Sequence, residues 1–455
     1  MSPLDFLLER WGSYSRQDAI IWNGETYSYT WLTERVAASE TFIQQEKIQP
    51  GSVVILEGDF SPNSIAFFLA LIKVHCIIVP LTSATRRNHN EFAEIALGEV
   101  SIQVDDHDRV SVARLGARRG HPLYEILRTA NHPGLVVFSS GSTGKSKAAV
   151  HDFVPLLEKF RPIRRSFRTL TFLLFDHLGG LNTLLYILSN GGCVVTVAAR
   201  TPDRVLEAVE RWRVELMPTS PTFLNLILLS GAYERYDLSS IRLVTYGTEP
   251  MSESTLKRFC RLLPNVEMLQ TYGLSEIGVM RSKSKSSDSL WVKIGGEEFQ
   301  TRVVDGLLEV KAKSAMLGYL NAPSPFTPDG WLITGDSVEV DGEYVRILGR
   351  KSELINVGGE KVYPCEVEGV IQEMEDVADV TVYGEKNPIM GNIVCARVRL
   401  KEGAERDKFA ARLKQYCRQK LNEFKVPVRV ELAESNLHSE RFKKERASNL
   451  TLAEE

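Results

Sequence analysis

A short polar segment, residues 139–147, combines the kinds of group that bind polyphosphate. Glycines let backbone N–H groups converge on an anion, hydroxyls donate hydrogen bonds, and lysines oppose the negative charge. All three kinds are concentrated here, in Ser139, Ser140, Gly141, Ser142, Thr143, Gly144, Lys145, Ser146 and Lys147. The apolar run 135–138 directly before them is typical of a strand. We therefore expect a phosphate-binding loop at the end of a strand.

The phosphate loop of NTPases is one alternative, because residues 144–146 complete its Gly-Lys-Ser/Thr ending. That motif also requires a glycine five residues before Gly144, where this chain has Ser139. The NTPase loop opens a helix, whereas residues 148–150 are short, apolar and typical of a strand. The NTPase interpretation therefore fails, and a polar hairpin that binds no ligand remains as the other alternative.

Five segments together resemble motifs of the adenylate-forming superfamily, which contains acyl-CoA synthetases, peptide-synthetase adenylation domains and beetle luciferases. The loop matches the family pattern Ser/Thr-Ser-Gly-Ser/Thr-Thr-Gly-x-Pro-Lys, except that Ser146 replaces proline. The other segments follow in the family's order: 246–250 (Tyr-Gly-Thr-Glu-Pro), 270–276 (Gln-Thr-Tyr-Gly-Leu-Ser-Glu), 331–336 (Trp-Leu-Ile-Thr-Gly-Asp) and 349–366. The resemblance spans about residues 20–446.

This resemblance implies a reaction in two halves. A carboxylate attacks the α-phosphate of ATP to give an acyl-adenylate and pyrophosphate, and the thiol of CoA then attacks the acyl carbon and releases AMP. Such chemistry needs charge stabilisation and exclusion of water more than it needs a nucleophile on the enzyme. The implied cofactors and substrates are ATP, Mg²⁺, coenzyme A and a small carboxylic acid.

The resemblance also assigns roles to five polar residues. Glu276 is implied as the Mg²⁺ ligand, since a hard cation prefers carboxylate oxygen, and Ser275 as a hydroxyl donor to the α-phosphate. Tyr272 is implied to stack on adenine. Asp336 would accept from both ribose hydroxyls, because an ionised carboxylate has two acceptor oxygens, and Arg350 would hold the ribose. A solvated surface position for Glu276 and core packing for Tyr272 are the alternatives.

Glycine-containing segments complete the implied pockets. The segment that resembles the lining of the adenine and acyl pockets continues after Tyr246 with Gly247, Thr248, Glu249 and Pro250. Gly358 and Gly359 belong to the motif that bridges two domains. They resemble the face of the lid beside the thiol tunnel, where glycines would let a pantetheine arm approach the backbone.

The adenylation lysine is harder to place, because the C-terminal motif is degenerate. The family pattern is Pro-x-Thr-x-x-Gly-Lys-x-x-Arg, and residues 437–446 lack both its proline and its glycine. Alignment on Lys-x-x-Arg puts the lysine at Lys443, with Lys444 as the alternative. A cation there would stabilise charge in the first half-reaction only. A solvated basic tail is the other interpretation.

The acid-binding end of the site rests on fewer residues. His177, in segment 175–180, resembles the residue that many acyl-CoA synthetases place at the carboxylate end of the acyl pocket. Tyr246 and Gly247 are expected to form another wall. An ordinary core or surface histidine is an equal alternative. Aromatic and fatty acids both fit an apolar pocket, so the acid is not identified.

Alternating strand and helix patterns must position these residues. Apolar residues recur three or four apart in the helical segments, and the strand-like runs are short and β-branched. The expected strands are 53–56, 77–79, 193–197, 216–218 and 241–246, and the expected helices are 63–74, 202–212 and 252–263. Repeated βα units predict parallel sheets covered by helices.

The pattern changes near residue 340. A hairpin with an Asp341-Gly342 turn is followed by strands at 377–382 and 393–398 and by a helix at 404–421. The expected fold is α/β, with an N-terminal domain, residues 1–350, of βα-built sheets covered by helices. A small mobile α+β lid would occupy residues 351–455, and the resemblance implies that it rotates between the half-reactions.

Composition agrees with a globular enzyme that acts on small molecules. The 455 residues are 43% hydrophobic and 25% charged, and a net charge of −3 provides no field that would recruit nucleic acid. The six cysteines lie far apart without metal-ligand spacing, so free thiols in the cytoplasm are expected. No apolar run reaches the ~18 residues that a membrane span needs.

Three functions are compatible with these residues. The first is an ATP-dependent acid–thiol ligase that makes acyl-CoA. The second keeps the adenylation step but delivers the acyl group to the pantetheine of an acyl carrier protein or to an amine. The third is an inactive adenylate-binding protein, suggested by the degenerate C-terminal motif. Acid-dependent pyrophosphate release and a product assay with free CoA would separate them.

Overall fold

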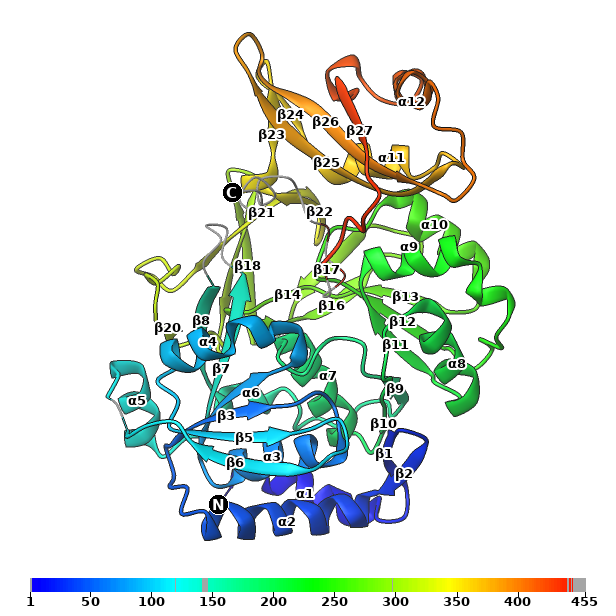
Figure 1. Cartoon of the computed structure of the whole chain (residues 1–455). Helices are drawn as coiled ribbons and strands as arrows, with labels where there is room; N and C mark the ends of the chain where they lie inside the picture. The colour runs from blue at the N-terminus through cyan, green and yellow to red at the C-terminus, as the bar shows by residue number, and fades with distance from the viewer. Residues whose placement is uncertain are drawn as a thin grey trace.

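The computed structural model describes residues 2–118, 120–140, 146–296, 298–439, 442 and 444. A large N-terminal domain carries three sheets, and a small C-terminal domain with its own sheet lies at one end of it (Figure 1). The expected α/β fold, with a large N-terminal domain and a small C-terminal domain, is confirmed.

The first sheet has seven strands, and all neighbouring strands are parallel except the last pair. Their order is β13 (Glu267–Gln270), β12 (Leu243–Tyr246), β11 (Leu216–Thr219), β9 (Arg168–Leu170), β10 (Cys193–Val195), β1 (Asp18–Trp22) and β2 (Glu25–Ser28). Three amphipathic helices bury their apolar faces against one side: α8 (Pro202–Trp212), α9 (Pro221–Ser230) and α10 (Glu253–Leu262).

These three helices begin where the sequence supplies caps. Thr201, Ser220 and Ser252 each accept a hydrogen bond from a backbone N–H of the first turn. Such caps satisfy N–H groups that have no partner within the helix. Proline occupies the first position of α8 and α9, where no N–H is required. The expected helices 202–212 and 252–263 are confirmed, to within a residue at each end.

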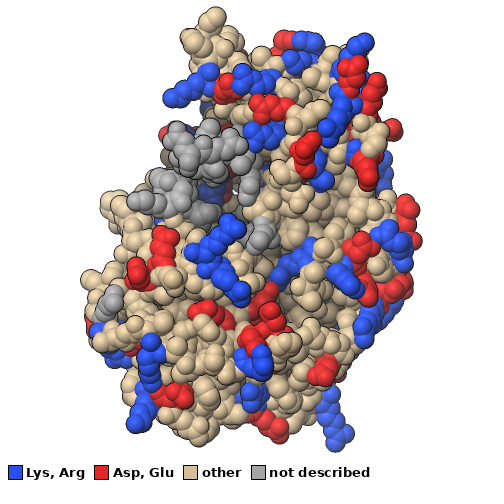
Figure 2. Space-filling view, viewed as in Figure 1, with Lys and Arg blue, Asp and Glu red and all other residues tan. Residues whose placement is uncertain are grey.

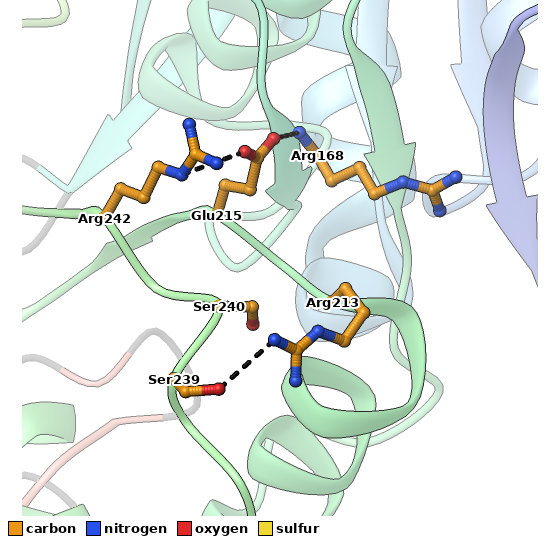
Figure 3. A pocket seen from close by; sticks show the side chains of 6 residues that line it. All are labelled: Arg168, Arg213, Glu215, Ser239, Ser240 and Arg242. Atoms are coloured by element: carbon orange, nitrogen blue, oxygen red, sulfur yellow. Dashed lines mark hydrogen bonds and ion pairs between the residues drawn. The ribbon is translucent and has the colours of Figure 1, made fainter.

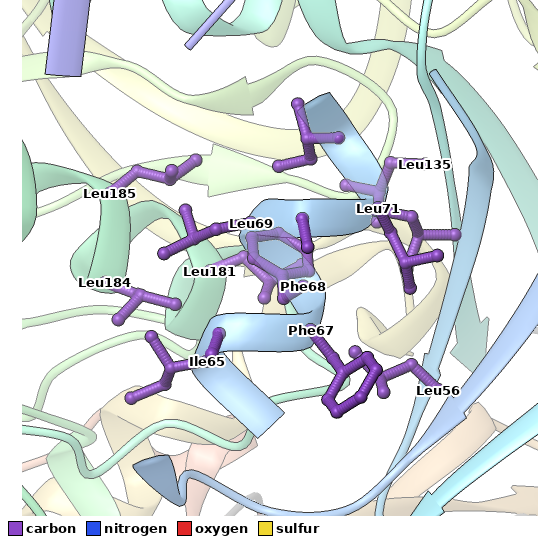
Figure 4. Close-up of a cluster of buried hydrophobic side chains, with 14 of the residues drawn as sticks. Leu56, Ile65, Phe67, Phe68, Leu69, Leu71, Leu135, Leu181, Leu184 and Leu185 are labelled. Atoms are coloured by element: carbon purple, nitrogen blue, oxygen red, sulfur yellow. The ribbon is translucent and has the colours of Figure 1, made fainter. Parts of the chain in front are cut away.

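The second sheet also has seven strands, with a parallel centre. Their order is β20 (Gly318–Tyr319), β8 (Ser146–Asp152), β7 (Gly134–Ser140), β4 (Ile77–Leu81), β3 (Val53–Glu57), β5 (Val100–Val104) and β6 (Val110–Arg114). Figure 4 shows the main core, in which apolar side chains of α3 (Pro62–Lys73) and α7 (Leu178–Ser189) pack together with Leu56 of β3 and Leu135 of β7.

The remaining helices of the large domain contribute apolar side chains to two clusters, the main core and a second, separate one. The second face of the second sheet is covered by the apolar side chains of α4 and α5, which form a separate cluster with its strands. The bounds are α1 (Asp5–Ser13), α2 (Tyr29–Gln45), α4 (His89–Ile95), α5 (Pro122–Ala130) and α6 (Phe153–Glu158), with short 3₁₀ turns η1 (Ser83–Asn88) and η2 (Ala232–Glu234).

The third sheet is antiparallel throughout and was not expected as a separate unit. Its order is β16 (Arg281–Ser284), β17 (Trp291–Gly295), β22 (Tyr344–Arg350), β21 (Leu332–Asp341), β19 (Leu307–Ala312) and β18 (Phe299–Val304). The expected Asp-Gly hairpin is confirmed, because Asp341 pairs with Tyr344 across the turn. A short hairpin, β14 (Gly273–Leu274) and β15 (Gly278–Val279), precedes the sheet.

The C-terminal domain, called the lid below, has an apolar core of its own. It contains strands β23 (Ile355–Val357), β24 (Glu360–Val362), β25 (Val377–Asn387), β26 (Gly391–Leu400) and β27 (Arg429–Leu432), helices α11 (Pro364–Ile371) and α12 (Phe409–Arg418), and 3₁₀ turns η3 (Lys351–Glu353) and η4 (Glu423–Lys425). Helix α12 starts later than the expected 404–421, because Lys408 has a positive φ of 52° that interrupts the helical pattern, and it ends at Arg418.

The structure forms no disulfide among the six cysteines, all of which it describes. No helix in the described part of the chain is both long enough and apolar enough to cross a membrane.

Candidate active site

Neighbouring parallel strands of the first sheet deliver two of the singled-out segments to one edge. Tyr246 ends β12 and Gln270 ends β13, and these two residues are paired across the strands. Segments 246–250 and 270–276 therefore leave the sheet side by side, at its carboxyl-terminal edge. Ligands of open α/β sheets bind at such edges.

The phosphate-loop segment connects β7 to β8. Ser139 pairs with Lys147, and Ser140 pairs with Ser146. The segment after the loop is thus a strand, as expected, and not the helix that an NTPase loop would open. Asn321 fixes the returning strand, accepting from the N–H of Ala148 at 3.0 Å and donating to the carbonyl of Ser146 at 2.9 Å. Gly141, Ser142, Thr143 and Gly144 lie outside the described residues.

Asp336 is the centre of a hydrogen-bonded group at the entry of the third sheet. Its carboxylate accepts from the Tyr272 hydroxyl at 2.5 Å and forms an ion pair with Nε of Arg350 at 2.9 Å. Arg350 also donates to the carbonyl of Thr334 at 2.6 Å. Burial raises the pKa of Asp336, and the positive charge of Arg350 opposes this shift. Three residues expected at the ribose and adenine therefore lie in direct contact.

Tyr272 is mostly buried, with 6% of its surface exposed, and its ring belongs to the apolar core of the third sheet. Burial raises the pKa of its hydroxyl, and the negative charge of Asp336 adds to this effect. Core packing, which was the alternative interpretation, therefore accounts for most of this ring. Adenine stacking on the remaining surface stays a prediction.

Glu276 and Lys147 meet through a residue that the sequence did not single out. The hydroxyl of Tyr319 donates to Oε1 of Glu276, and Nζ of Lys147 lies 5.4 Å from the centre of the Tyr319 ring. The carbonyl of Glu276 accepts from the N–H of Met316 at 2.7 Å. The contact joins the last lysine of the phosphate loop to the carboxylate expected to bind Mg²⁺. Tyr319 was missed because β20 has only two residues and shows no readable periodicity.

The backbone carbonyl of Ser275 is held by a hydrogen bond from a buried histidine. Nε2 of His151 lies 2.6 Å from the carbonyl oxygen of Ser275. His151 is fully buried, and burial lowers its pKa to about 4. The ring is therefore neutral at pH 7 and donates from Nε2. His151 ends an apolar run in the sequence, which is the only local sign that it is a core residue.

Segment 247–250 is closely packed. A Cβ atom on Gly247 would lie 2.6 Å from Oγ1 and 2.7 Å from the carbonyl oxygen of Thr271, so glycine is required for the approach of the two segments. Thr248 has a positive φ of 72°. Oε1 of Glu249 accepts from the N–H of Thr222 at 2.8 Å, and burial raises the pKa of Glu249. Glu249 therefore caps α9, and its proposed nucleotide contact stays a prediction.

The two residues expected at the acid have structural contacts of their own. Nδ1 of His177 accepts from the N–H of Gly179 at 3.0 Å and so caps α7. Tyr246 is 1% exposed and packs among side chains from α8, α9 and α10. Its hydroxyl has no hydrogen-bond partner in the described part of the chain. Their roles at the acid stay predictions.

The C-terminal tail of the lid reaches the same edge of the first sheet. The backbone N–H of Lys444 lies 3.4 Å from Oε2 of Glu249. Its ammonium group points back into the lid, where it donates to the carbonyl of Val380 at 2.7 Å and lies 3.5 Å from the buried Glu368 carboxylate. Lys443 lies outside the described residues.

Gly358 and Gly359 form the turn between β23 and β24, with φ angles of 60° and 96°. The N–H of Gly358 donates to the carbonyl of Met390 at 2.8 Å, and that of Gly359 to Oδ1 of Asn356 at 2.9 Å. Positive φ angles favour glycine at both positions. The role of this turn beside a thiol tunnel stays a prediction.

A hollow on the first sheet is a different feature. It lies at the opposite, amino-terminal edge and is lined by Arg168, Arg213, Glu215, Ser239, Ser240 and Arg242 (Figure 3). Each arginine is paired with a carboxylate, in the pairs Arg168–Asp18, Arg213–Asp237 and Arg242–Glu215. The hollow is therefore electrically balanced and separate from the site described above.

Charged side chains of both signs are interspersed over the face of the molecule shown in Figure 2. Within the described part of the chain, no three or more His, Cys, Asp and Glu side chains are arranged to hold a metal ion.

Residues 8–296 match the model of the AMP-binding enzyme family, and residues 366–444 match the model of the AMP-binding enzyme C-terminal domain. Because the first match alone covers more than half of the chain, the protein belongs to the AMP-binding enzyme family. The resemblance inferred from the motifs is thereby confirmed.

The chain is similar to several CoA ligases. It is 30% identical over 325 residues to indoleacetate–CoA ligase of Aromatoleum aromaticum, covering 66% of this chain and 63% of the relative. It is 27% identical over 456 residues to feruloyl-CoA synthase of an Amycolatopsis species, covering 91% and 92%. The matches to the first three curated relatives cover 61–63% of their length.

The fold is that of known structures. A crystal structure of the anthranilate CoA ligase AuaEII in complex with anthranoyl-AMP superposes with a TM-score of 0.80 at 18% identity, covering 96% of this chain and 94% of that one. At this level of identity the similarity establishes the fold alone.

Proposed function

We propose that this protein is an AMP-forming acid–thiol ligase, which activates a carboxylic acid with ATP as acyl-AMP and transfers the acyl group to the thiol of coenzyme A. One observation carries the proposal. The hydrogen-bonded residues around Asp336 and the contact between Glu276 and Tyr319 lie on the same side of the sheets. The tail of the lid also reaches this side, through the contact between Lys444 and Glu249. A nucleotide bound there would touch both domains.

The ribose is proposed to bind at Asp336. Both carboxylate oxygens already accept one hydrogen bond, from Tyr272 and from Arg350, and each carboxylate oxygen can accept a second. Arg350 would hold the ribose from the side of the lid. The adenine would pack against Tyr272 and the segment Gly247, Thr248, Glu249 and Pro250.

The phosphates are proposed to lie against the β7–β8 loop. Ser139, Ser140, Gly141, Ser142, Thr143, Gly144 and Lys147 would supply N–H, hydroxyl and ammonium donors. Ser275 would donate its hydroxyl to the α-phosphate. His151 holds the backbone of Ser275 in place and stays neutral at pH 7, so it adds no charge to the site.

Glu276 is proposed to ligate Mg²⁺. A carboxylate is the donor that this hard cation prefers, and a single protein carboxylate suffices where phosphates of the substrate complete the coordination. When bound, the ion neutralises charge that develops on the phosphates. Tyr319 donates to one oxygen of Glu276 and so fixes the orientation of the carboxylate.

Lys443 is proposed as the adenylation lysine, since its rival has another role. The Lys444 ammonium group is surrounded by the Val380 carbonyl and the Glu368 carboxylate, and only 9% of its side chain is exposed. Leaving that position would strand the buried Glu368 carboxylate, which is costly. The lysine next to it in the sequence is therefore the better candidate.

Exchange of Lys443 for alanine tests this assignment. We expect Lys443→Ala to abolish acyl-adenylate formation and to leave thioester formation from supplied acyl-adenylate and CoA intact. Lys444→Met serves as the control, because it should lower the stability of the lid and not remove the adenylation chemistry. Full adenylation by Lys443→Ala would refute the assignment.

The domain boundary is proposed at residues 350 and 351. Strand β22 of the large domain ends at Arg350, and the lid sheet begins at Ile355. A mobile lid, residues 351–455, would then present Gly358 and Gly359 to the thiol of CoA in the second half-reaction. A Cβ atom on Gly359 would meet no atom within 4 Å, so this side of the turn would leave room for a pantetheine arm.

The acid is proposed to be aromatic, with His177 at its carboxylate end and Tyr246 as a wall. The names of the relatives, indoleacetate–CoA ligase and feruloyl-CoA synthase, support an aromatic substrate. A fatty acid is the alternative substrate. An acyl carrier protein or an amine is the alternative acceptor. Pyrophosphate release across a panel of aryl and fatty acids, followed by identification of the product with CoA, carrier protein and amines, tests the proposal. No acid-dependent release with any acid would favour an inactive adenylate-binding protein.

A further inference from the structure

A turn near the end of the described part of the lid touches the large domain. His438 pairs with Lys444 in an antiparallel bridge, and the N–H of Phe442 donates to the carbonyl of Ser439 at 2.9 Å. In Figure 1 this red segment leaves β27 and runs down to the large domain beside α9. Phe442 is thus carried to a surface that belongs to the other domain.

The ring of Phe442 packs against two buried aromatic rings of the large domain. Its centre lies 5.2 Å from that of Phe172 and 5.1 Å from that of Phe223. Phe172 and Phe223 are 2% and 0% exposed, and the centres of their rings lie 4.4 Å apart. The hydroxyl of Ser220 donates to the carbonyl of Phe442 at 3.1 Å. The lid therefore extends the apolar core of the first sheet by one ring.

The backbone of Phe442 is strained. Its φ of +51° lies in the left-handed region, which a bulky residue rarely adopts. The family pattern quoted above has glycine at this position, and glycine would adopt the conformation without strain. The presence of phenylalanine therefore indicates that the side chain itself is used.

The same turn is anchored in the lid at its other end. The ammonium group of Lys444 is held by the Val380 carbonyl and by the Glu368 carboxylate. A movement of the lid must therefore move Phe442 with it. The turn couples the position of the lid to the Phe172–Phe223 pair.

Two other contacts between the lid and the large domain are neutral hydrogen bonds. Ser252 donates to Oε1 of Gln372 at 3.3 Å, and Ser254 donates to the carbonyl of Gly369 at 3.0 Å. Water replaces such neutral hydrogen bonds at little cost when two surfaces separate. A buried aromatic ring in a well-packed pocket is the kind of contact that dominates interface energetics.

We propose that Phe442 is a positioning residue for acyl-adenylate formation. Its ring docks the lid tail on Phe172 and Phe223, holds the lid in the orientation seen here, and withdraws when the lid turns for thiol transfer. The effect on catalysis rests on the proposed function, since Lys443, the proposed adenylation lysine, follows Phe442 in the sequence. The docking itself does not depend on that function.

The experiment compares four variants of the full chain. Phe442→Ala removes the ring, Phe442→Gly removes it and also relieves the backbone strain, and Phe442→Leu keeps much of the apolar volume. Val428→Ala, at an exposed apolar position of the lid, is the matched control. Pyrophosphate release without CoA and thioester formation from supplied acyl-adenylate are measured separately. Hydrogen exchange of the first turn of α9 reports docking.

For Phe442→Ala and Phe442→Gly we expect kcat for adenylation to fall at least about tenfold, as for removal of a central aromatic contact. KM for ATP should change less than about twofold, because the nucleotide contacts are untouched. Thioester formation should be unimpaired, and exchange at α9 should rise. Phe442→Leu should lie between these variants and the wild type, and Val428→Ala should behave as wild type.

Four results would overturn the proposal. Normal adenylation by Phe442→Ala would show that the ring is dispensable. Recovery in Phe442→Gly would show that the backbone conformation matters instead of the ring. An equal loss of both half-reactions would indicate general destabilisation. If the wild type activates no acid, the proposed function fails, and unchanged exchange at α9 in Phe442→Ala would separately refute the docking role.

Discussion

Asp336 combines burial with charge. It is 6% exposed, burial raises its pKa, and the Arg350 guanidinium group opposes that rise. A buried carboxylate with two positioned donors is pre-organised to accept further hydroxyl hydrogen bonds, because its orientation is already fixed. This residue should therefore contribute more to nucleotide affinity than an exposed carboxylate would.

Exchange of Asp336 for asparagine removes the charge and keeps the shape. We expect Asp336→Asn to raise KM for ATP by about 10- to 100-fold, since hydrogen bonds to a charged group contribute about 1.5–3 kcal/mol each. Asp341→Asn is the matched control, because Asp341 forms an exposed ion pair with Lys285 on the far end of the same strand. Initial rates of pyrophosphate release measure both, and an equal KM in the two variants would contradict the role of Asp336.

His151 makes the stability of the protein depend on pH. Its folded-state pKa of about 4 lies below the ordinary value of 6.5, so the unfolded chain binds the proton more readily. The stabilisation is complete above pH 6.5 and is lost as the pH falls from 6.5 towards 4. The shift corresponds to at most about 3–4 kcal/mol.

Exchange of His151 for glutamine tests this dependence, because glutamine can still donate to the Ser275 carbonyl without titrating. We expect His151→Gln to lose less stability than the wild type between pH 7 and pH 4.5. The urea midpoint of unfolding at the two pH values measures the loss. Parallel losses in wild type and variant would show that other groups account for the acid sensitivity.

At the scale of elements, the site depends on the distance between the two segments that follow β12 and β13. Gly247 approaches Thr271 so closely that any side chain would collide with a backbone carbonyl. The N–H of Thr271 also donates to the carbonyl of Tyr246 at 2.8 Å, which extends the pairing of the two strands by one step. The spacing between the two segments is therefore set by the backbone.

A methyl group at Gly247 should push these segments apart. We expect Gly247→Ala to destabilise the large domain by about 1–3 kcal/mol, as overpacking of a close contact does, and to reduce adenylation. Gly116→Ala is the control, because a Cβ atom there would meet no atom within 4 Å. Thermal unfolding and pyrophosphate release measure the two effects. Wild-type values in Gly247→Ala would mean that the segments adjust without cost.

The parallel part of the fold could be read from the sequence because its strands and helices bury continuous faces. Helix α8 has the bounds that its apolar spacing predicts. The third sheet could not be read in the same way. Only the first residue of β18 is buried, so this strand offers no alternation of apolar and polar residues. Its pairing with β19 becomes visible only in three dimensions.

The residues of the candidate site also divide into those that the sequence indicates and those that only the structure reveals. Motifs gave Asp336, Tyr272, Arg350 and Glu276, because local sequence carries the resemblance. They could not give Tyr319, which reaches Glu276 from 43 positions away. Nor could they separate Lys443 from Lys444, since that choice depends on Glu368 and Val380, which are distant in the sequence.

At the scale of the whole molecule, a thiol of the chain lies at the contact between the lid and the large domain. Sγ of Cys365, at the start of α11, lies 3.7 Å from the carbonyl of Pro250 in the large domain. Rotation of the lid would separate the two and expose the thiol. We expect maleimide to label Cys365 several times faster in the presence of AMP plus acyl-CoA than in the presence of ATP plus the acid.

Cys260 provides the internal control for this labelling. It is also partly exposed, lies in α10 of the large domain, and contacts the carbonyl of Ser287 at 3.4 Å, away from the lid. Its rate of labelling should be the same in both mixtures. Peptide mass spectrometry separates the two thiols, and identical rates for Cys365 in the two mixtures would argue against a second lid orientation.

Arg350 belongs to two structural features at the same time. It is the last residue of β22, next to the proposed domain boundary, and it is the ion-pair partner of Asp336. If ribose binding shifts this guanidinium group, the chain that leaves toward the lid shifts with it. Thermodynamic reciprocity then requires that the lid angle change the affinity for the nucleotide by the same factor as the nucleotide biases the angle. Release of AMP and the return of the lid would thus be one coupled equilibrium, with a single side chain as the coupling element.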